Sequence, residues 1–436
     1  MSRQIDRIGG WRAERGRLRG LGALALVGLI VSGCAGQAAA MAEATSSATR
    51  VPGSPAGAAQ AAAAIDAFGF DFYDATLASG GNAVVSPASI VLALSMAQVG
   101  AAGETAAQMD KVLHSAVGSG GGNGINSLDL ALAGLSGTFK DVTGTGRQVT
   151  LRIANAPFAQ RGLQLQSPYL DTLATKYGAG LRLADFQNDP SGACRLIDGW
   201  VSDQTEGRIP DLLDSLDPAT RLVLVNAIYM KAPWQTPFDK LATQTSPFTR
   251  PDGSQVSVPM MGQSLAGGLY ASGSGWQAAQ LPYLGGSLAM TIVVPDDLAS
   301  FEKTLDADRF AQITSALQSV DLDLSLPRFK IGTKSDLSAS LSSMGMPLAF
   351  DRDQADFSGI TTQERLYIAK VIHQADISVD ENGTEATAAT AVVMAAASGV
   401  PTASVTLHVD RPFLFAVRDT DTGAILFLGR VVDPSA

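Results

Sequence analysis

The segment from Gly383 to Ala397 constrains the fold of this chain more than any other feature of its sequence. It consists of small and apolar residues without proline, and its single charge is Glu385. An exposed segment of this composition extends readily and adds as a strand to an open sheet edge. A helix is the alternative interpretation, because alanine is the residue that most favours helices. A fold that leaves this segment on its surface must therefore control where it becomes a strand.

The composition indicates a globular chain with a large core and excludes several kinds of function. The 436 residues are 46% hydrophobic and 17% charged, which provides enough apolar surface for such a core. At about 150 residues per domain, this length suggests two or three domains, or one large domain. With 31 basic and 41 acidic residues the net charge is −10, so we expect no nucleic-acid partner. Two cysteines and three histidines offer neither a disulfide framework nor a histidine-built metal site, and we expect no metal and no cofactor.

Residues 1–33 have the pattern of an export signal. Six arginines precede the apolar run Leu21 to Val31, which is too short to span a bilayer but suits a signal peptide. The run ends in Val-Ser-Gly-Cys34, which resembles the bacterial lipoprotein signal, where cleavage precedes the cysteine and its thiol is lipidated. An ordinary secretory signal that contains a cysteine is the alternative. The lipoprotein interpretation predicts export and a lipid anchor at the outer face of a bacterial membrane. A protein that is shed or secreted is the alternative.

The rest of the chain divides into a tether and one folded domain. Residues 34–60 are rich in Ala, Gly, Ser and Thr and have no apolar period, which predicts a flexible tether. From residue 61 to residue 436 no low-complexity stretch is long enough to be a domain linker. We therefore expect a single domain over 61–436.

Helical patterns precede strand patterns in this domain. Ser86 and Pro87 predict an N-cap and the first residue of a helix that runs to about Ala101, and a second helix is predicted over 196–213. The apolar run 222–230 predicts a strand buried on both faces. Residues 320–326 alternate as a strand, and the runs 413–417 and 424–431 flank a Thr-Asp-Thr-Gly turn as a hairpin does. Helices packed on an antiparallel or mixed sheet define an α+β class.

Six segments together resemble the serpin family, and the likeness covers nearly all of residues 61–436. Each segment alone is weak evidence, but the whole set in order and spacing is specific. The segments are NAVVSPASI at 82–90, GAAGETA at 100–106, NAPF at 155–158, LVLVNAIY at 222–229 followed by Trp234, LSLPRF at 324–329 and ENGTEA at 381–386.

The resemblance implies the serpin fold, in which helices pack on a large central mixed β-sheet and further sheets, with an exposed reactive-centre loop. It also implies an inhibitor of serine proteases that is not itself an enzyme. A protease cuts the loop and forms an acyl-enzyme, and the cut loop inserts into the central sheet. About 16 inserted residues at roughly 3.3 Å each carry the protease on the order of 50 Å. Deacylation then fails because the distorted protease loses its oxyanion hole and triad geometry.

Counting along the loop as in the family places the reactive bond at Ala397-Ser398, with Ala395 and Ala396 as alternatives. The register is open because the stretch from the cut to Pro412 is longer than in compact members. Every register puts a small apolar residue before the bond. We therefore expect a partner protease with a small apolar primary specificity pocket, elastase-like or subtilisin-like. No Lys or Arg occurs between Glu381 and Arg411 to attract a trypsin-like enzyme.

The hinge of the loop resembles that of inhibitory members. Strand alternation from Thr384 turns every second side chain inward, and all of these are uncharged: Thr384, Ala386, Ala388, Thr390, Val392 and Met394. The opposite set faces solvent in this prediction, and it includes Glu385. A charge at an inward position would oppose burial by several kcal/mol. The predicted hinge residues are Gly383, Thr384, Glu385, Ala386, Thr387, Ala388, Ala389 and Thr390.

Two further polar clusters are carried over from the resemblance. Trp234, Arg328 and Glu381 resemble the breach, where the loop first enters the sheet; a surface ion pair worth about 0–1 kcal/mol beside a core indole is the alternative. The second cluster resembles the shutter under the opening strands, and a satisfied core histidine is the alternative for its imidazole. Its residues are Ser86, Ser89, Asn226 and His373.

Other functions fit the sequence less well. No Gly-x-Ser-x-Gly motif is present and the three histidines lack a hydrolase frame, so we do not expect hydrolysis. The serious alternative is a non-inhibitory serpin, a surface binding or adhesion protein whose loop is merely cleaved. A heparin-type cofactor is not expected, because no basic helix occurs and the chain without residues 1–33 has 25 basic and 39 acidic residues. We expect a monomer that contacts the membrane through its lipid anchor only.

Overall fold

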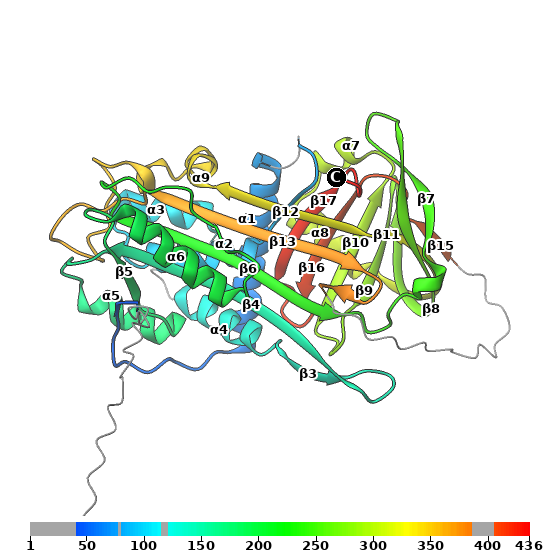
Figure 1. Ribbon diagram of the computed structural model, residues 1–436, viewed down its shortest axis with the longest axis horizontal. Helices are drawn as coiled ribbons and strands as arrows, with labels where there is room; N and C mark the ends of the chain where they lie inside the picture. The colour runs from blue at the N-terminus through cyan, green and yellow to red at the C-terminus, as the bar shows by residue number, and fades with distance from the viewer. Residues whose placement is uncertain (1–40, 77–79, 115–120, 386–404) are drawn as a thin grey trace, which may run out of the picture. The chain divides into compact units, whose positions relative to one another are not determined.

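Strand β6 (Leu222–Pro233) lies inside a large mixed sheet (Figure 1). Leu224 and Ile228 face one hydrophobic cluster, and Val223 and Val225 face a second cluster on the opposite side. The strand is therefore buried on both faces, as its continuous apolar run predicts. The computed structural model describes residues 41–76, 80–114, 121–385 and 405–436.

The central sheet combines parallel and antiparallel pairs. Strand β6 is antiparallel to β4 and parallel to β13, and β12 is antiparallel to β13. A short hairpin strand, β3 (Gly137–Lys140), pairs with the first residues of β4. The order across the sheet is β1 (Glu43–Ala44), β5 (Leu181–Ala184), β4 (Gly146–Gln160), β6, β14 (Gly383–Thr384), β13 (Lys370–Asp380) and β12 (Phe329–Asp336).

A second sheet is built mainly from the later half of the chain, so the predicted α+β class is confirmed. The predicted hairpin at 413–431 is present as two antiparallel strands at one side of this sheet. Its strands in order are β15 (Val405–His408), β11 (Gln318–Pro327), β8 (Gln255–Gly273), β9 (Trp276–Pro282), β10 (Leu288–Pro295), β16 (Phe413–Asp419), β17 (Ile425–Val431) and β2 (Ala83–Val85), with β7 (Gln244–Thr249) on β8.

Helices cover both faces of the central sheet. Helix α6 (Pro190–Gln204) packs on one face, and α1 (Pro55–Thr76) and α2 (Pro87–Gln98) pack on the other (Figure 1). Helix α2 begins as predicted, because the Ser86 side chain accepts a hydrogen bond from the Ser89 N–H and Pro87 is its first residue. The other helices are α3 (Gly103–Val112), α4 (Gly121–Ala133), α5 (Ser167–Thr172), α7 (Leu298–Glu302), α8 (Ala307–Ser315) and α9 (Ser338–Met344). None of the helices in these described ranges is long and apolar enough to cross a membrane.

The folded body begins before residue 61, so the predicted tether over 34–60 is too long. Strand β1 pairs with β5, and α1 begins at Pro55. Between them the Arg50 side chain donates to Asn126 at 2.8 Å, and the Val51 N–H donates to the Thr175 carbonyl at 3.0 Å. These polar and backbone contacts need no apolar period, which is why the composition of the segment does not indicate them.

The helix predicted over 196–213 is also wrong in its bounds. Helix α6 starts at Pro190 and ends at Gln204, and Glu206 and Gly207 then both adopt positive φ angles, 54° and 77°. Beyond them Ile209, Leu212 and Leu213 are buried against the sheet without being helical. The segment packs on the sheet through apolar residues that repeat at helical spacing, although it is not helical.

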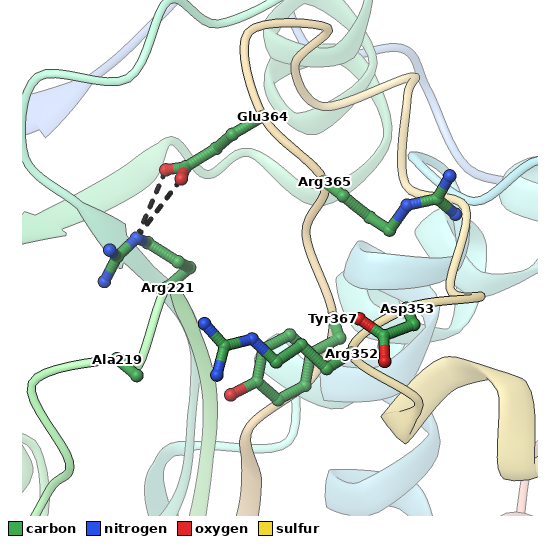
Figure 2. Close-up of a pocket in the computed structure, with 7 residues that line it drawn as sticks. All are labelled: Ala219, Arg221, Arg352, Asp353, Glu364, Arg365 and Tyr367. Carbon is green, nitrogen blue, oxygen red and sulfur yellow. Dashed lines mark hydrogen bonds and ion pairs between the residues drawn. The ribbon is translucent and has the colours of Figure 1, made fainter.

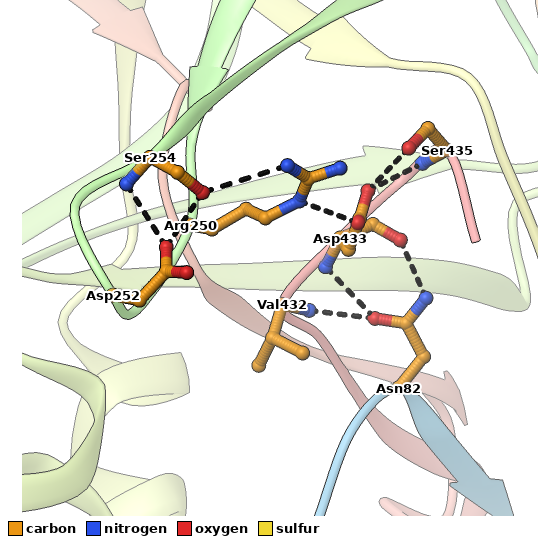
Figure 3. Close-up of polar contacts among 7 residues, drawn as sticks. All are labelled: Asn82, Arg250, Asp252, Ser254, Val432, Asp433 and Ser435. Atoms are coloured by element: carbon orange, nitrogen blue, oxygen red, sulfur yellow. Dashed lines mark hydrogen bonds and ion pairs between the residues drawn. The ribbon is translucent and has the colours of Figure 1, made fainter.

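The carboxyl terminus is fixed by polar contacts between distant segments (Figure 3). The Asn82 side-chain oxygen accepts from the N–H groups of Val432 at 2.8 Å and Asp433 at 3.0 Å. The Arg250 guanidinium donates to the Asp433 carboxylate at 2.6 Å. The last residues therefore join β2 to the turn between β7 and β8, and the end of the second sheet is held from both sides.

Candidate functional site

The central sheet contains a short inserted strand where the hinge begins. Gly383 and Thr384 form β14, which is antiparallel to β6 on one side and to β13 on the other. Further along, β6 and β13 pair directly, from Val223 opposite Lys370 to Ile228 opposite Ala375. We call this line of direct pairing the β6–β13 seam. Two of the predicted hinge residues are thus paired between β6 and β13 at one end of the sheet, and along the seam the two strands pair directly.

Only glycine fits the first of these two positions. Gly383 has φ +147°, and a Cβ atom there would lie 2.1 Å from the Ala232 carbonyl oxygen. The backbone of β14 approaches β6 closely because no side chain separates them.

Thr384 is fully inside the sheet and faces an aromatic pair. Its side chain is 1% exposed, and its hydroxyl shares a 2.6 Å hydrogen bond with the Tyr283 hydroxyl. The Tyr283 ring stacks on Trp234 with centroids 4.4 Å apart. Burial raises the pKa of Tyr283 far above its usual value, so this hydroxyl stays protonated. The first inward position of the loop is therefore occupied and hydrogen-bonded in the intact chain.

Trp234 joins the end of β13 to the residues that follow β6. Its indole N–H donates to the Asp380 carbonyl at 2.9 Å, and its backbone N–H donates to the Asn382 carbonyl at 2.9 Å. Trp234, a single buried residue, therefore bonds to the backbone on both sides of Glu381 in the turn between β13 and β14.

Glu381 lies in the same turn and is buried, unlike the residues of a surface ion pair. Its carboxylate accepts from Arg328 Nε at 2.8 Å and from the Thr243 hydroxyl at 2.5 Å. Burial acts to raise the pKa of Glu381, but the hydrogen bonds from Arg328 and Thr243 outweigh it, and the net pKa lies below its usual value. The structure thus brings Trp234, Arg328 and Glu381 together around the first hinge residues.

The expectation that Glu385 faces solvent is wrong. Its side chain points to the face opposite Thr384, as alternation requires, but it is only 10% exposed and lies 3.5 Å from the Arg208 guanidinium. Arg208 belongs to the non-helical segment that follows α6, and this segment covers this part of the sheet. Burial raises the pKa of Glu385 despite the attraction of Arg208. Glu385 also has φ +47°, so the extended conformation of the hinge ends there.

A second polar cluster lies beneath the seam, on the face covered by α2. The His373 and Asn226 side chains are hydrogen-bonded across the seam, and the other ring nitrogen of His373 accepts from the Ser86 N–H at 3.1 Å. The Ser89 hydroxyl donates to the Asn155 side chain of β4 at 2.8 Å. The start of α2 therefore contacts β4 and β13, and β6 through His373.

His373 is neutral in this cluster. Burial lowers its pKa to about 3, and both ring nitrogens already have partners. It therefore has no free nitrogen to take a proton from a nucleophile, and its contacts instead join β13 to β6 and α2. Within the described residues the Asn226 side-chain nitrogen has no partner, which is a weak point of the seam.

Sequence reasoning missed four residues that complete these clusters. Tyr283, Thr243, Arg208 and Asn155 come from segments far from the residues they contact, and none of the first three carries a local signal. Asn155 belongs to the NAPF segment, but its bond to Ser89 has no signature in sequence. The predicted Cys34, Ala386, Thr387, Ala388, Ala389, Thr390, Ala397 and Ser398 lie outside the described residues.

Comparisons with known proteins agree with this architecture. The family model described as Serpin (serine protease inhibitor) matches residues 63–434. An uncharacterized serpin-like protein of Thermococcus kodakarensis is 38% identical over 376 residues, which cover 85% of each chain. Leukocyte elastase inhibitor of Homo sapiens is 34% identical over 367 residues, covering 81% of this chain and 93% of the inhibitor. The native structure of tengpin, a thermophilic serpin, aligns with a TM-score of 0.78 at 27% identity, over 90% of this chain and 99% of tengpin.

These helices on mixed sheets, with a hinge that starts inside the central sheet, define a protein of the serpin class. The chain belongs to the serpin family, whose members are described as serine protease inhibitors. The predicted family and fold are therefore confirmed.

Proposed function

We propose that this protein is a suicide inhibitor of serine proteases that have a small apolar primary pocket. A protease serine attacks the carbonyl of Ala397, or of the neighbouring Ala396 or Ala395, and the amine of the next residue leaves. The resulting ester links the protease to the new carboxyl end of the loop. Insertion of the loop along the β6–β13 seam then separates the protease from its starting position before water can cleave the ester.

One observation carries this proposal: β14 is already paired on both sides between β6 and β13. This pairing supports the proposal that the sheet accepts the loop, since Thr384, the first inward residue, is uncharged and already buried there. Continuing the same alternation places only uncharged residues inward up to Met394. Each added residue would replace seam contacts by hydrogen bonds to both neighbouring strands.

The small residues of the loop support the choice of target. Alanine precedes the reactive bond in every register, and the leukocyte elastase inhibitor among the relatives bears the name of a protease that it inhibits. A shallow apolar pocket accepts alanine, whereas a trypsin-like pocket requires the Lys or Arg that this loop lacks. Elastase-like and subtilisin-like enzymes are therefore the proposed partners.

The test is incubation of residues 34–436 with a pancreatic-type elastase and, separately, with subtilisin. The proposal predicts a complex that survives boiling in detergent, and mass spectrometry should find the protease serine linked to Ala395, Ala396 or Ala397. Trypsin serves as the control and should form no such complex. Cleavage of the loop by elastase and subtilisin without a complex would support the alternative, a surface binding protein whose loop is only cut.

We also propose that Cys34 is lipidated and that the protein is exported and anchored at the outer face of a bacterial membrane. The Val-Ser-Gly-Cys34 sequence supports this, since the cysteine directly follows the apolar run and two small residues. Cys34→Ala should abolish partition into the membrane fraction and labelling with a fatty-acid probe. An unlabelled wild-type protein would contradict the anchor.

A further inference from the structure

A pocket of about 280 Å³ lies where β6 begins and where the chain approaches β13 (Figure 2). One wall comes from Ala219 and Arg221, directly before β6. The opposite wall comes from the segment that leads into β13 and includes Arg352 and Tyr367. The two walls therefore stand on the two sides of the β6–β13 seam, at the end far from β14.

The pocket is rich in uncommitted hydrogen-bond donors. Arg221 uses Nε for Glu364 at 3.2 Å and one terminal nitrogen for the carbonyls of Pro218 and Thr220. Its second terminal nitrogen has no partner among the residues that the structure describes. Within the described residues, Arg352 and the Tyr367 hydroxyl make no hydrogen bond or ion pair. Arg352 alone offers five donors in a planar fork.

These donors start from opposite walls, and their side-chain ends converge toward Ala219. Figure 2 shows the guanidinium groups of Arg221 and Arg352 and the Tyr367 hydroxyl on the side of Ala219. The Asp353 carboxylate and the Arg365 guanidinium lie on the other side, where Arg365 donates to the Ala355 carbonyl at 3.1 Å. The Asp353 and Glu364 carboxylates also line the pocket, but Glu364 is paired with Arg221 and Asp353 lies across from the unpaired donors. Such a group of donors fits an oxyanion, because guanidinium groups bind such anions through paired, charge-assisted hydrogen bonds.

Insertion of the loop would pull these two walls apart. The Ala369 N–H donates to the Leu222 carbonyl at 3.0 Å, so the seam is closed next to the pocket. Thr384 stands opposite Ala232, and a strand that continued from Thr384 along β6 would reach the level of Leu222 ten residues later. A further strand there would widen the sheet by about 4.8 Å and would move the two walls apart.

We propose that this pocket binds a small tetrahedral oxyanion, phosphate or a phosphate monoester, and that the bound anion holds the end of the β6–β13 seam closed. Binding itself does not depend on the proposed inhibitory function, whereas the effect on the seam rests on it. The anion contacts Arg221 on one wall and Arg352 and Tyr367 on the other. It therefore binds the intact chain in preference to the inserted one and slows insertion.

The first experiment measures binding by calorimetry at constant ionic strength, with inorganic phosphate and glycerol phosphate as separate ligands. Arg352→Gln should weaken binding about tenfold or more, the loss expected for a charged hydrogen bond. Arg147→Gln, the same change at the start of β4 near the other end of the sheet, should leave the affinity unchanged. Binding of either ligand supports the site, and the ligand with the higher affinity shows whether the site prefers free phosphate or a phosphate ester. Failure of both to bind, or equal binding by Arg352→Gln, would overturn the site.

The second experiment separates the site from the proposed function. The loop is cut near Ala397, and phosphate affinity and the thermal unfolding midpoint are measured before and after the cut. A higher midpoint with lost phosphate binding supports the seam effect. A higher midpoint with unchanged binding overturns the seam effect while leaving the inhibitory mechanism intact. An unchanged midpoint together with unchanged binding contradicts insertion, and with it the seam effect, but not the pocket.

Discussion

Replacing Thr384 by arginine tests whether the loop must enter the sheet for inhibition. Thr384 is 1% exposed and its hydroxyl is bonded to Tyr283, so an arginine at this position cannot stay inside without burying an unpaired charge. The burial of such a charge is opposed by several kcal/mol. The loss of the hydroxyl also leaves the Tyr283 hydroxyl without a partner, which costs about 1–3 kcal/mol. We therefore expect Gly383 and Thr384→Arg to leave the sheet in the intact protein.

The same substitution blocks the first step of insertion after cleavage. If about 4 kcal/mol of this cost is present in the transition state for insertion, the step slows on the order of a thousandfold. We expect acylation to be unaffected, because the proposed reactive bond lies eleven to thirteen residues further along the chain. Hydrolysis of the acyl-enzyme then precedes insertion, and the inhibitor becomes a substrate.

The assay is the number of inhibitor molecules consumed per protease inactivated, read together with the gel-stable complex. Wild type should consume close to one, and Thr384→Arg should consume many while its loop is cut at the wild-type rate. Thr384→Ser keeps the hydroxyl and is the matched control, which should inhibit nearly normally. Glu385→Arg is unsuitable as a control, because Glu385 lies against Arg208. Equal trapping by Thr384→Arg and wild type would refute the argument that insertion begins at this residue.

Two further predictions concern stability. Burial lowers the pKa of His373 from 6.5 to about 3, so the stability that depends on its neutral form is fully present above pH 6.5 and should be lost as the pH falls from 6.5 to 3. Thermal unfolding of His373→Gln should therefore show a shallower pH dependence over that window. A pH dependence identical to that of wild type would contradict the assignment. The Arg430 guanidinium donates to the buried Glu302 carboxylate at 2.9 and 3.0 Å. In urea titrations, Arg430→Met should lower the free energy of unfolding by about 3–5 kcal/mol, and the double variant with Glu302→Gln should recover part of this loss. A loss below about 1 kcal/mol would show that Glu302 finds another partner.

The parts of the fold that sequence predicts are those fixed by local pattern. The apolar run of β6 and the Ser86 cap of α2 depend on residues within one element, and both are present. Residues 41–54 could not be predicted, since they are held by backbone and polar bonds to segments more than seventy positions away. The burial of Glu385 depends in the same way on Arg208. Arg208 lies above the sheet because the helix ends at the positive φ angles of Glu206 and Gly207, and the helical spacing of the apolar residues that follow hides this end in the sequence.

The hinge clusters show the same division. Gly383 and Thr384 are predicted as hinge residues from the resemblance and from strand alternation, whereas the close approach of Gly383 to Ala232 appears only in the structure. The partners that hold them, Tyr283 and Trp234, come together only when two sheets meet, and a stacked aromatic pair has no signature in sequence. The sequence therefore indicates the roles of the hinge residues, but not the contacts that hold them.

The most direct test of the account is the thermal stability of the protein before and after one cut in the loop. Subtilisin at a low ratio should nick the chain near Ala397, and the two fragments remain associated in a native gel. The account predicts a clearly higher unfolding midpoint for the nicked protein, because the freed loop completes a strand along the β6–β13 seam. An unchanged or lower midpoint would show that the central sheet does not accept the loop, and would contradict inhibition by insertion.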